Sequence, residues 1–135
     1  MNNISQYLLG YGIRPSIQRI AIMRYLTNNR THPTVDEIFE VMRKQIPTLS
    51  KTTVYNTLKL FVEQGAAIYI GIDEKSGRFD GCVTPHGHFR CKKCGKIIDL
   101  DMEINNLLPE NFHGTIDEAD FYIKGTCEDC IVKNN

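Results

Sequence analysis

The apolar positions of residues 15–65 recur at intervals of three or four residues, the period of an α-helix. Three helices are expected there. The first begins after Pro15-Ser16 and ends at Asn28-Asn29; the second begins with a capping box at Thr34; the third begins at Ser50 and ends at Gly65. Their expected apolar faces comprise Ile17, Ile20, Met23 and Leu26, then Val35, Ile38, Phe39 and Met42, then Val54, Leu58, Phe61 and Val62.

The pattern after Gly65 is typical of strands. Residues 66–72 predict a strand, 73–77 a turn and 78–83 a returning strand. Further short strands are expected at 86–91, 96–101 and 120–126, with one helix near Met102–Leu108 that Pro109 ends. Three helices followed by a hairpin is the order of a winged helix. The sequence therefore predicts an α+β protein with a winged helix-turn-helix domain at 1–83 and a small α/β domain at 84–135.

The composition is that of a globular protein. The chain has 135 residues, of which 41% are hydrophobic and 24% charged, enough for one ordinary domain or two small ones. No apolar run approaches the roughly 20 residues of a membrane span, so no membrane association is expected. The first residues carry no pattern of a secretory signal, which favours a cytoplasmic location with reduced thiols.

The formal net charge of zero hides an asymmetry between the two halves. Residues 1–60 carry eight basic and three acidic side chains, a balance of +5, whereas residues 61–135 carry eight basic and thirteen acidic ones, a balance of −5. Such an asymmetry indicates that the first half meets a polyanion. Arg14, Arg19 and Lys51 are the expected contacts to DNA phosphates.

Two Cys-x-x-Cys pairs, Cys91/Cys94 and Cys127/Cys130, carry the strongest chemical signal. Each pair can turn two thiolates onto one ion, and four thiolates complete a tetrahedral, structural Zn²⁺ site. The alternative is a redox-active pair, but neither pair stands between a strand and a helix as a thioredoxin-like motif does. A domain of about 50 residues needs such a metal, a partner subunit or both. Cys82 is interpreted as a small buried hydrophobic residue rather than a sensor or ligand.

His86-Gly87-His88 is the second candidate metal motif. Alternate residues of a strand face the same side, so both imidazoles can reach one ion, and a turn at the first cysteine pair places Asp99 opposite them. Asp80 reaches the same place if residues 81–85 bend, and His32 precedes a helix in the first half. Nitrogen and oxygen ligands suit Fe²⁺, Mn²⁺ or Zn²⁺. The alternative is that these are ordinary surface histidines.

The helix expected after Ser50 has a polar face opposite its apolar one. This face comprises Thr52, Tyr55, Asn56 and Lys59. For an isolated helix, a solvated surface would be the better interpretation. As the third helix before a hairpin, in the basic half, it is instead expected to read base edges in the major groove.

Several motifs together resemble the Fur family of bacterial metalloregulators. They are Thr31-His32-Pro33-Thr34, Ser50–Leu58, Arg78-Phe79-Asp80, the run from His86 to Lys96, and Cys127-x-x-Cys130, in this order over nearly the whole chain. The resemblance implies an N-terminal winged helix, a C-terminal α/β dimerisation domain with a four-cysteine zinc, and a regulatory metal. It also implies a homodimer that binds A·T-rich palindromic double-stranded DNA operators and represses transcription.

Within the family, the chain is most similar to the peroxide-sensing PerR branch. Iron-uptake regulators usually carry Glu where this chain has Asp99, and Tyr55 is followed here by Asn56. The resemblance implies that Fe²⁺ reacts with hydrogen peroxide and oxidises His32 or His86, which releases DNA, whereas Mn²⁺ keeps the repressor bound. The regulatory ligands that it implies are His32, Asp80, His86, His88 and Asp99.

Many relatives carry a histidine for a third metal site where this chain has Glu118-Ala119, so no third site is assigned, and His113 is not taken as its ligand.

Three alternatives to the expected function remain. An iron-responsive repressor is the alternative within the family. The second alternative is a metal-dependent enzyme, which would need a general base that is not already a metal ligand, and the sequence offers none. The third is a zinc-ribbon interaction module, which would leave the candidate ligands outside the cysteines without a role. A non-enzymatic repressor is therefore expected.

Overall fold

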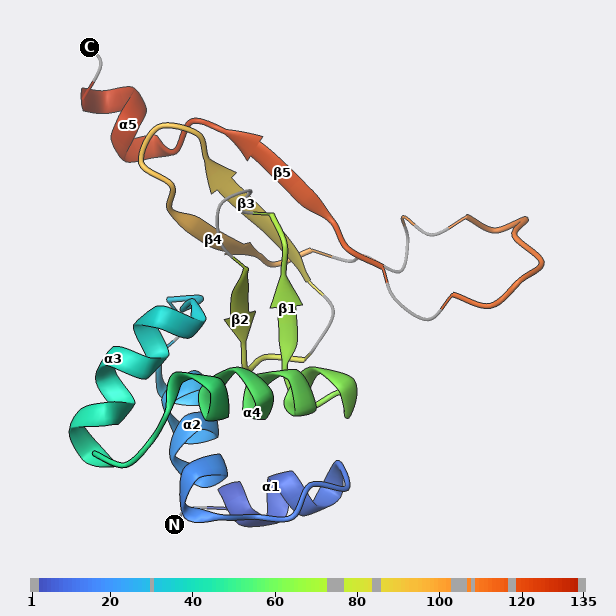
Figure 1. The fold of residues 1–135 in the computed structure, drawn as a ribbon. Coiled ribbons are helices and arrows are strands. Elements are labelled where there is room, and N and C mark those ends of the chain that lie inside the picture. The colour runs from blue at the N-terminus through green and yellow to red at the C-terminus, as the bar shows by residue number, and fades with distance from the viewer. Residues whose placement is uncertain are drawn as a thin grey trace. The chain divides into compact units, whose positions relative to one another are not determined.

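The computed structural model divides the chain into two compact units, Met1–Val83 and Thr84–Asn135 (Figure 1). The described residues are 3–29, 31–72, 77–83, 86–102, 107, 109–116 and 119–133. The DNA-binding and dimerisation roles expected for the two stretches stay predictions.

The first unit contains four helices and one hairpin. They are α1 (Ile4–Gly10), α2 (Ile17–Asn28), α3 (Val35–Gln45), α4 (Lys51–Glu63), β1 (Ile68–Ile70) and β2 (Arg78–Asp80). The three predicted helices are confirmed. Helix α1 was not predicted. It buries Leu8, and its Tyr7 hydroxyl donates a hydrogen bond to the Ala66 carbonyl (2.7 Å). This contact attaches α1 to the segment between α4 and β1.

Side-chain caps explain where the three predicted helices begin. The hydroxyls of Ser16 and Ser50 accept hydrogen bonds from the backbone N–H groups three residues on, at 3.1 and 3.0 Å. Thr34 forms a complete capping box, because its hydroxyl accepts from the Glu37 N–H while the Glu37 carboxylate accepts from the Thr34 N–H. These contacts satisfy N–H groups that a helix leaves without intrahelical partners.

The core of the first unit lies between its helices. Fully buried side chains come from every helix and include Leu8, Ile22, Met23, Leu26, Ile38, Met42, Val54, Leu58 and Phe61. The assignment of Ile17 to the apolar face of α2 is wrong, because its side chain is 79% exposed. Ile17 is the first residue of α2, and the buried side chains of this helix begin only at Ile22.

The hairpin of the first unit is shorter than predicted. β1 pairs antiparallel with β2, with Ile68 opposite Asp80 and Ile70 opposite Arg78. Residues 73–76 of the predicted turn lie outside the described residues. The ring of Tyr69 covers Gly77, where an added Cβ would lie 2.2 Å from the ring. Gly77 therefore permits the tyrosine to lie across the hairpin.

The second unit is a three-stranded sheet followed by a short helix. Its elements are β3 (Gly87–Cys91), β4 (Ile97–Leu100), β5 (Tyr122–Gly125) and α5 (Glu128–Lys133), with strand order β4-β3-β5. β3 pairs antiparallel with β4 and parallel with β5. The three predicted strands are confirmed over fewer residues. Helix α5 was not predicted, and it places the pair Cys127/Cys130 between a strand and a helix, contrary to the expectation for both cysteine pairs. Most of the helix expected near Met102–Leu108 falls outside the described residues.

The described part of the second unit has almost no buried apolar side chain. Its only buried hydrophobic residues are Cys91 and Cys127, whereas sixteen such residues lie in the first unit. Hydrophobic burial therefore holds the first unit together, and the second depends on its sheet and on whatever its cysteines bind. In the described residues, no helix is long and apolar enough to cross a membrane.

Candidate functional site

The four cysteines of the second unit come from two short segments that the sheet brings together. Cys91 ends β3 and Cys94 closes the turn after it, while Cys127 precedes α5 and Cys130 lies within it. The parallel pairing of β3 with β5 ends at Cys91 opposite Gly125, and the Lys92 N–H donates to the Gly125 carbonyl (2.7 Å). The strand pairing thus places both Cys-x-x-Cys pairs at the same end of the sheet.

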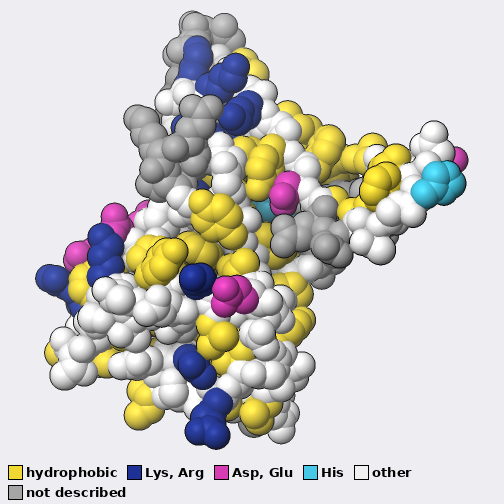
Figure 2. Space-filling view, turned by 45° about the vertical axis from the view of Figure 1, so that its right-hand side comes forward, with side chains coloured by type: hydrophobic (Ala, Val, Ile, Leu, Met, Phe, Trp, Pro, Cys, Tyr) yellow, Lys and Arg dark blue, Asp and Glu magenta, His cyan; other side chains and the backbone are white. Residues whose placement is uncertain are grey.

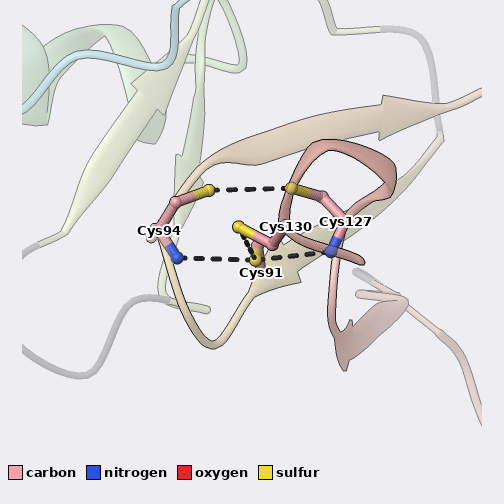
Figure 3. Close-up of side chains that lie close together, drawn as sticks. All are labelled: Cys91, Cys94, Cys127 and Cys130. Atoms are coloured by element: carbon pink, nitrogen blue, oxygen red, sulfur yellow. Dashed lines mark hydrogen bonds between the residues drawn. The ribbon is translucent and has the colours of Figure 1, made fainter. Parts of the chain in front are cut away.

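The geometry of the cysteines fits one tetrahedral ion (Figure 3). The Sγ atoms of Cys91 and Cys130 lie 3.7 Å apart, and those of Cys94 and Cys127 lie 3.8 Å apart. Four sulfurs at the Zn–S distance of about 2.3 Å in a tetrahedron would be separated by about 3.8 Å. All four Sγ atoms lie within 4.8 Å of one another, so the cluster can hold zinc.

Local electrostatics prepare part of this cluster for a cation. The backbone N–H groups of Cys94 (3.5 Å) and Cys127 (3.4 Å) donate to the Cys91 sulfur and lower the pKa of that thiol to about 5. The neighbouring Cys127 side chain, followed by burial, raises the pKa of Cys130 to about 12. Without an ion, therefore, the Cys91 sulfur is anionic while Cys130 keeps its proton. A divalent cation bound by all four sulfurs would displace that proton.

Basic side chains surround the two cysteine segments. Lys92, Lys93 and Lys96 are exposed there, and Figure 2 shows several Lys and Arg side chains gathered at the top of this unit. The ammonium group of Lys96 also lies 3.8 Å from the Asp129 carboxylate. Four thiolates around Zn²⁺ leave two negative charges, which nearby lysines offset.

The second candidate cluster of this unit lies at the other end of β3. His88 stands directly opposite Asp99 in β4, which confirms the predicted register. The Asp99 Oδ1 atom lies 3.1 Å from His86 Nε2 and 3.4 Å from His88 Nε2. The two imidazole centroids are 4.4 Å apart. One carboxylate oxygen thus faces two imidazole nitrogens.

Gly87, between these histidines, is enclosed on the opposite face of the strand. A Cβ added to it would lie 3.0 Å from Met102 Sδ and 3.0 Å from a ring carbon of Phe121. The His88 N–H also donates to the Phe121 carbonyl (2.9 Å). These contacts explain why a side chain is absent at position 87 and hold the backbone between the two histidines in place.

A second imidazole–carboxylate pair lies in the first unit. His32 Nε2 is 3.6 Å from Asp80 Oδ2, and both residues are buried. Ligands bound to one ion at about 2.1 Å, with angles of 90–120° between them, lie about 3.0–3.6 Å apart. All three imidazole–carboxylate distances fall within this range, so each unit carries a set of nitrogen and oxygen atoms that fits a divalent ion.

The predicted nucleic-acid face of α4 is exposed. Thr52, Tyr55, Asn56 and Lys59 are all accessible to solvent, whereas Val54, Leu58 and Phe61 on the other side are fully buried. The Tyr55 ring is 53% exposed. The helix thus presents hydroxyl, aromatic, amide and ammonium groups on one side.

The three predicted phosphate contacts have different surroundings. Arg14 is exposed. Arg19 is half-buried, and its guanidinium donates to the Arg14 carbonyl (2.9 Å), so it braces the turn before α2. Lys51, at the start of α4, forms an ion pair with Asp36 of α3. The sequence analysis did not foresee this pair, because nothing in the chain order indicates that the first turns of α3 and α4 meet.

The remaining candidates can be placed individually. Cys82 is half-buried rather than buried, which corrects its interpretation as a core residue, and its N–H donates to the Asp80 carboxylate (2.9 Å). His113 is exposed. Glu118 lies outside the described residues, so the third metal site is not tested.

Comparison with known proteins agrees with this arrangement. Residues 10–117 match the model of the ferric uptake regulator family. The chain is 34% identical to the "Peroxide operon regulator" of Bacillus subtilis (strain 168) over 128 residues, covering 92% of this chain and 88% of that protein.

Among solved structures, the ferric uptake regulator Fur of Helicobacter pylori superposes with a TM-score of 0.75 at 20% identity, covering 96% of this chain and 89% of the other. PerR from Streptococcus pyogenes gives a TM-score of 0.54 at 28% identity, covering 95% of this chain and 90% of the other. The first of these likenesses bears on the fold alone. Given the family match and the length of the shared sequence, the chain belongs to the ferric uptake regulator family.

Proposed function

We propose that this protein is a metal-dependent, peroxide-sensing transcriptional repressor that acts as a homodimer on double-stranded DNA, and not an enzyme. The observation that carries the proposal is the Asp99 carboxylate facing both His86 and His88 at ligand distances. The similarity to relatives named as a peroxide operon regulator and as peroxide-responsive repressors supports it. The exposed face of α4 supports the DNA-binding part.

In this proposal the metals have separate roles. Cys91, Cys94, Cys127 and Cys130 hold a structural Zn²⁺ that has no open position. His32, Asp80, His86, His88 and Asp99 together bind one regulatory Fe²⁺ or Mn²⁺, for which nitrogen and oxygen ligands are suited. Each unit alone offers only two or three of these ligands, so one ion bound by all five would restrict how the units move.

The regulatory Fe²⁺ supplies the reactivity toward peroxide. One oxygen atom of hydrogen peroxide is inserted into a C–H bond of the His32 or His86 ring and the other leaves as water. An oxidised ring would be a poorer ligand, so the protein would lose affinity for the regulatory ion and would release DNA. With Mn²⁺, the repressor stays bound to its operator. The α4 side chains Thr52, Tyr55, Asn56 and Lys59 contact bases, and Arg14, Arg19 and Lys51 contact phosphates.

Metal stoichiometry and DNA binding test the core of the proposal. The zinc-loaded protein should bind one further Mn²⁺ per chain and should then bind duplexes from a pool of A·T-rich inverted repeats. His32→Ala and His88→Ala should each abolish this second binding, whereas His113→Ala, at an exposed histidine, should not. DNA binding that is indifferent to added Mn²⁺ contradicts the proposal, and an unaffected His32→Ala variant contradicts the five-ligand set.

Mass spectrometry separates peroxide sensing from iron sensing. After one equivalent of hydrogen peroxide, the Fe²⁺-loaded protein should gain one oxygen on His32 or His86. Asp99→Glu should keep Mn²⁺-dependent DNA binding and oxidise more slowly, while Asp101→Glu, at an exposed acid two residues on, serves as the matched control. Unmodified histidines would favour an iron-responsive repressor instead.

A further inference from the structure

The main chain at His32 has an uncommon conformation. Its φ is +57°, and it is the only non-glycine residue with a positive φ among the described residues. His32 also precedes Pro33, and a residue before proline prefers an extended backbone. A left-handed conformation costs an ordinary side chain roughly 1–2 kcal/mol, so surrounding contacts have to hold it.

Strand β2 supplies those contacts with three consecutive residues. The Arg78 guanidinium donates to the His32 carbonyl (3.1 Å), the Phe79 N–H donates to the Pro33 carbonyl (3.0 Å), and the Asp80 carboxylate lies 3.6 Å from the His32 ring. Strand β2 therefore contacts both the backbone of this turn and the His32 imidazole. The Arg78 contact is made to the carbonyl of the strained residue itself.

The same guanidinium reaches the beginning of α3. Arg78 Nη1 lies 4.0 Å from Glu37 Oε1, the oxygen that accepts the Thr34 N–H in the capping box. The side chain of Arg78 is only 22% exposed, whereas that of Glu37 is 60% exposed. A planar guanidinium can serve two acceptors at once, which an ammonium group does with less geometric definition. Arg78 thus connects the His32 turn with the first turn of the helix that follows it.

We propose that Arg78 is a positioning residue for the regulatory metal: it holds His32 in the left-handed conformation that directs its imidazole toward Asp80 and ties this turn to the α3 cap. The inference rests on the proposed function, since it concerns His32 as a ligand. Arg78 touches neither the ion nor the peroxide. It acts through the backbone of His32, and its removal should weaken metal binding while the fold of the unit persists.

Cobalt binding to the full-length, zinc-loaded protein tests this role. Co²⁺ reports its ligand number and geometry through its visible d–d absorption, a signature that a general loss of stability does not imitate. Arg78→Gln should weaken Co²⁺ and Mn²⁺ affinity about 10- to 100-fold, the usual effect of losing a residue that orients a ligand. It should also change the Co²⁺ spectrum in the direction produced by His32→Ala. Arg78→Lys, which keeps the positive charge as well as N–H donors, should recover part of the affinity and of the spectrum relative to Arg78→Gln.

Arg43→Gln is the matched control. Arg43 also pairs with a glutamate of α3, Glu40, at 3.6 Å, but both side chains are exposed and no contact with His32 involves them. This variant should bind Co²⁺ as the unmodified protein does. Far-ultraviolet circular dichroism and thermal unfolding establish that each variant is folded. If Arg78→Gln does not fold, the comparison of Arg78→Lys with Arg43→Gln decides the question.

The outcomes distinguish this inference from the proposed function. If the unmodified protein binds no Co²⁺ beyond its zinc, or if His32→Ala leaves the spectrum unchanged, the five-ligand site itself is wrong. If the unmodified protein and His32→Ala behave as expected but folded Arg78 variants match Arg43→Gln in affinity and spectrum, only the positioning role is overturned.

Discussion

Removal of zinc should unfold the second unit and leave the first unit folded. The only buried hydrophobic residues in the described part of the second unit are Cys91 and Cys127. A four-ligand zinc site contributes about 10 kcal/mol or more to folding, and whole domains are stable by about 5–15 kcal/mol. The loss should therefore equal or exceed the entire stability of this unit.

The first unit does not share this dependence. It buries sixteen hydrophobic residues, and each fully buried large side chain contributes about 1.5–3 kcal/mol. Its stabilising burial therefore amounts to tens of kcal/mol, none of which involves the cysteine cluster. Chelation should convert a single folded molecule into one with a folded N-terminal unit and an unfolded C-terminal unit.

Hydrogen exchange followed by mass spectrometry measures this directly. After treatment with a zinc chelator under reducing conditions, amides of β3, β4 and β5 should exchange as in an unfolded chain, while those of α2 and α4 stay protected. Cys91→Ser should reproduce the effect, and Cys82→Ser should not. Strands that remain protected in protein shown by elemental analysis to contain no zinc would refute the reasoning.

Three smaller predictions concern the first unit. Burial raises the pKa of Tyr7 to about 12 from 10.0, so the stabilisation from its neutral hydroxyl is complete below pH 10 and is lost as the pH rises to 12. Tyr7→Phe, which loses the bond to the Ala66 carbonyl, should cost about 1 kcal/mol and flatten this decline in urea unfolding. Thr34→Ala should cost about 1 kcal/mol of stability in thermal unfolding, whereas Thr34→Ser should not. Arg14→Ala, at an exposed residue assigned to a phosphate, should reduce the salt dependence of DNA binding by about one unit of log–log slope, in contrast to the exposed Lys44→Ala; an equal slope for both contradicts the DNA-contact assignment.

The elements that sequence reasoning predicted are those with strong local signals. The helices after Ser16, Thr34 and Ser50 were predicted because cap residues and apolar periodicity coincide there. Helix α1 was missed because it has only seven residues, no side-chain cap and one buried residue. Short helices of this kind depend on tertiary contacts, here the bond from Tyr7 to Ala66. Ile17 is the opposite case: it fits the apolar periodicity of α2 but is exposed. Periodicity alone does not say which turns of a helix are covered by the rest of the protein.

The candidate site was predictable where it depends on strand geometry. His86, His88 and Asp99 follow from the alternation of side chains and from antiparallel pairing after a tight turn. The left-handed backbone of His32 was not predictable, because the residue before a proline favours the opposite region. The contacts of Arg78 with His32 and Glu37 could not be predicted either, because they depend on strand β2 packing beside a turn that lies 46 residues earlier in the chain.

Strand β3 gives the two candidate metal clusters of the second unit an order of dependence. His88 and Cys91 lie three residues apart on this strand, roughly 10 Å at the usual rise of a strand. Cys91 pairs with Gly125 of β5, and its N–H donates to the Lys96 carbonyl (2.9 Å) just before β4. The cysteine end of β3 therefore aligns this strand with both neighbours, including His88 opposite Asp99. Disruption of the cysteine cluster would therefore also disturb the arrangement of His88 and Asp99, whereas oxidation of a histidine would leave the cysteine cluster intact. Within five residues, β3 would thus hold one cluster on which the strand pairing depends and another that can change without unfolding the strand.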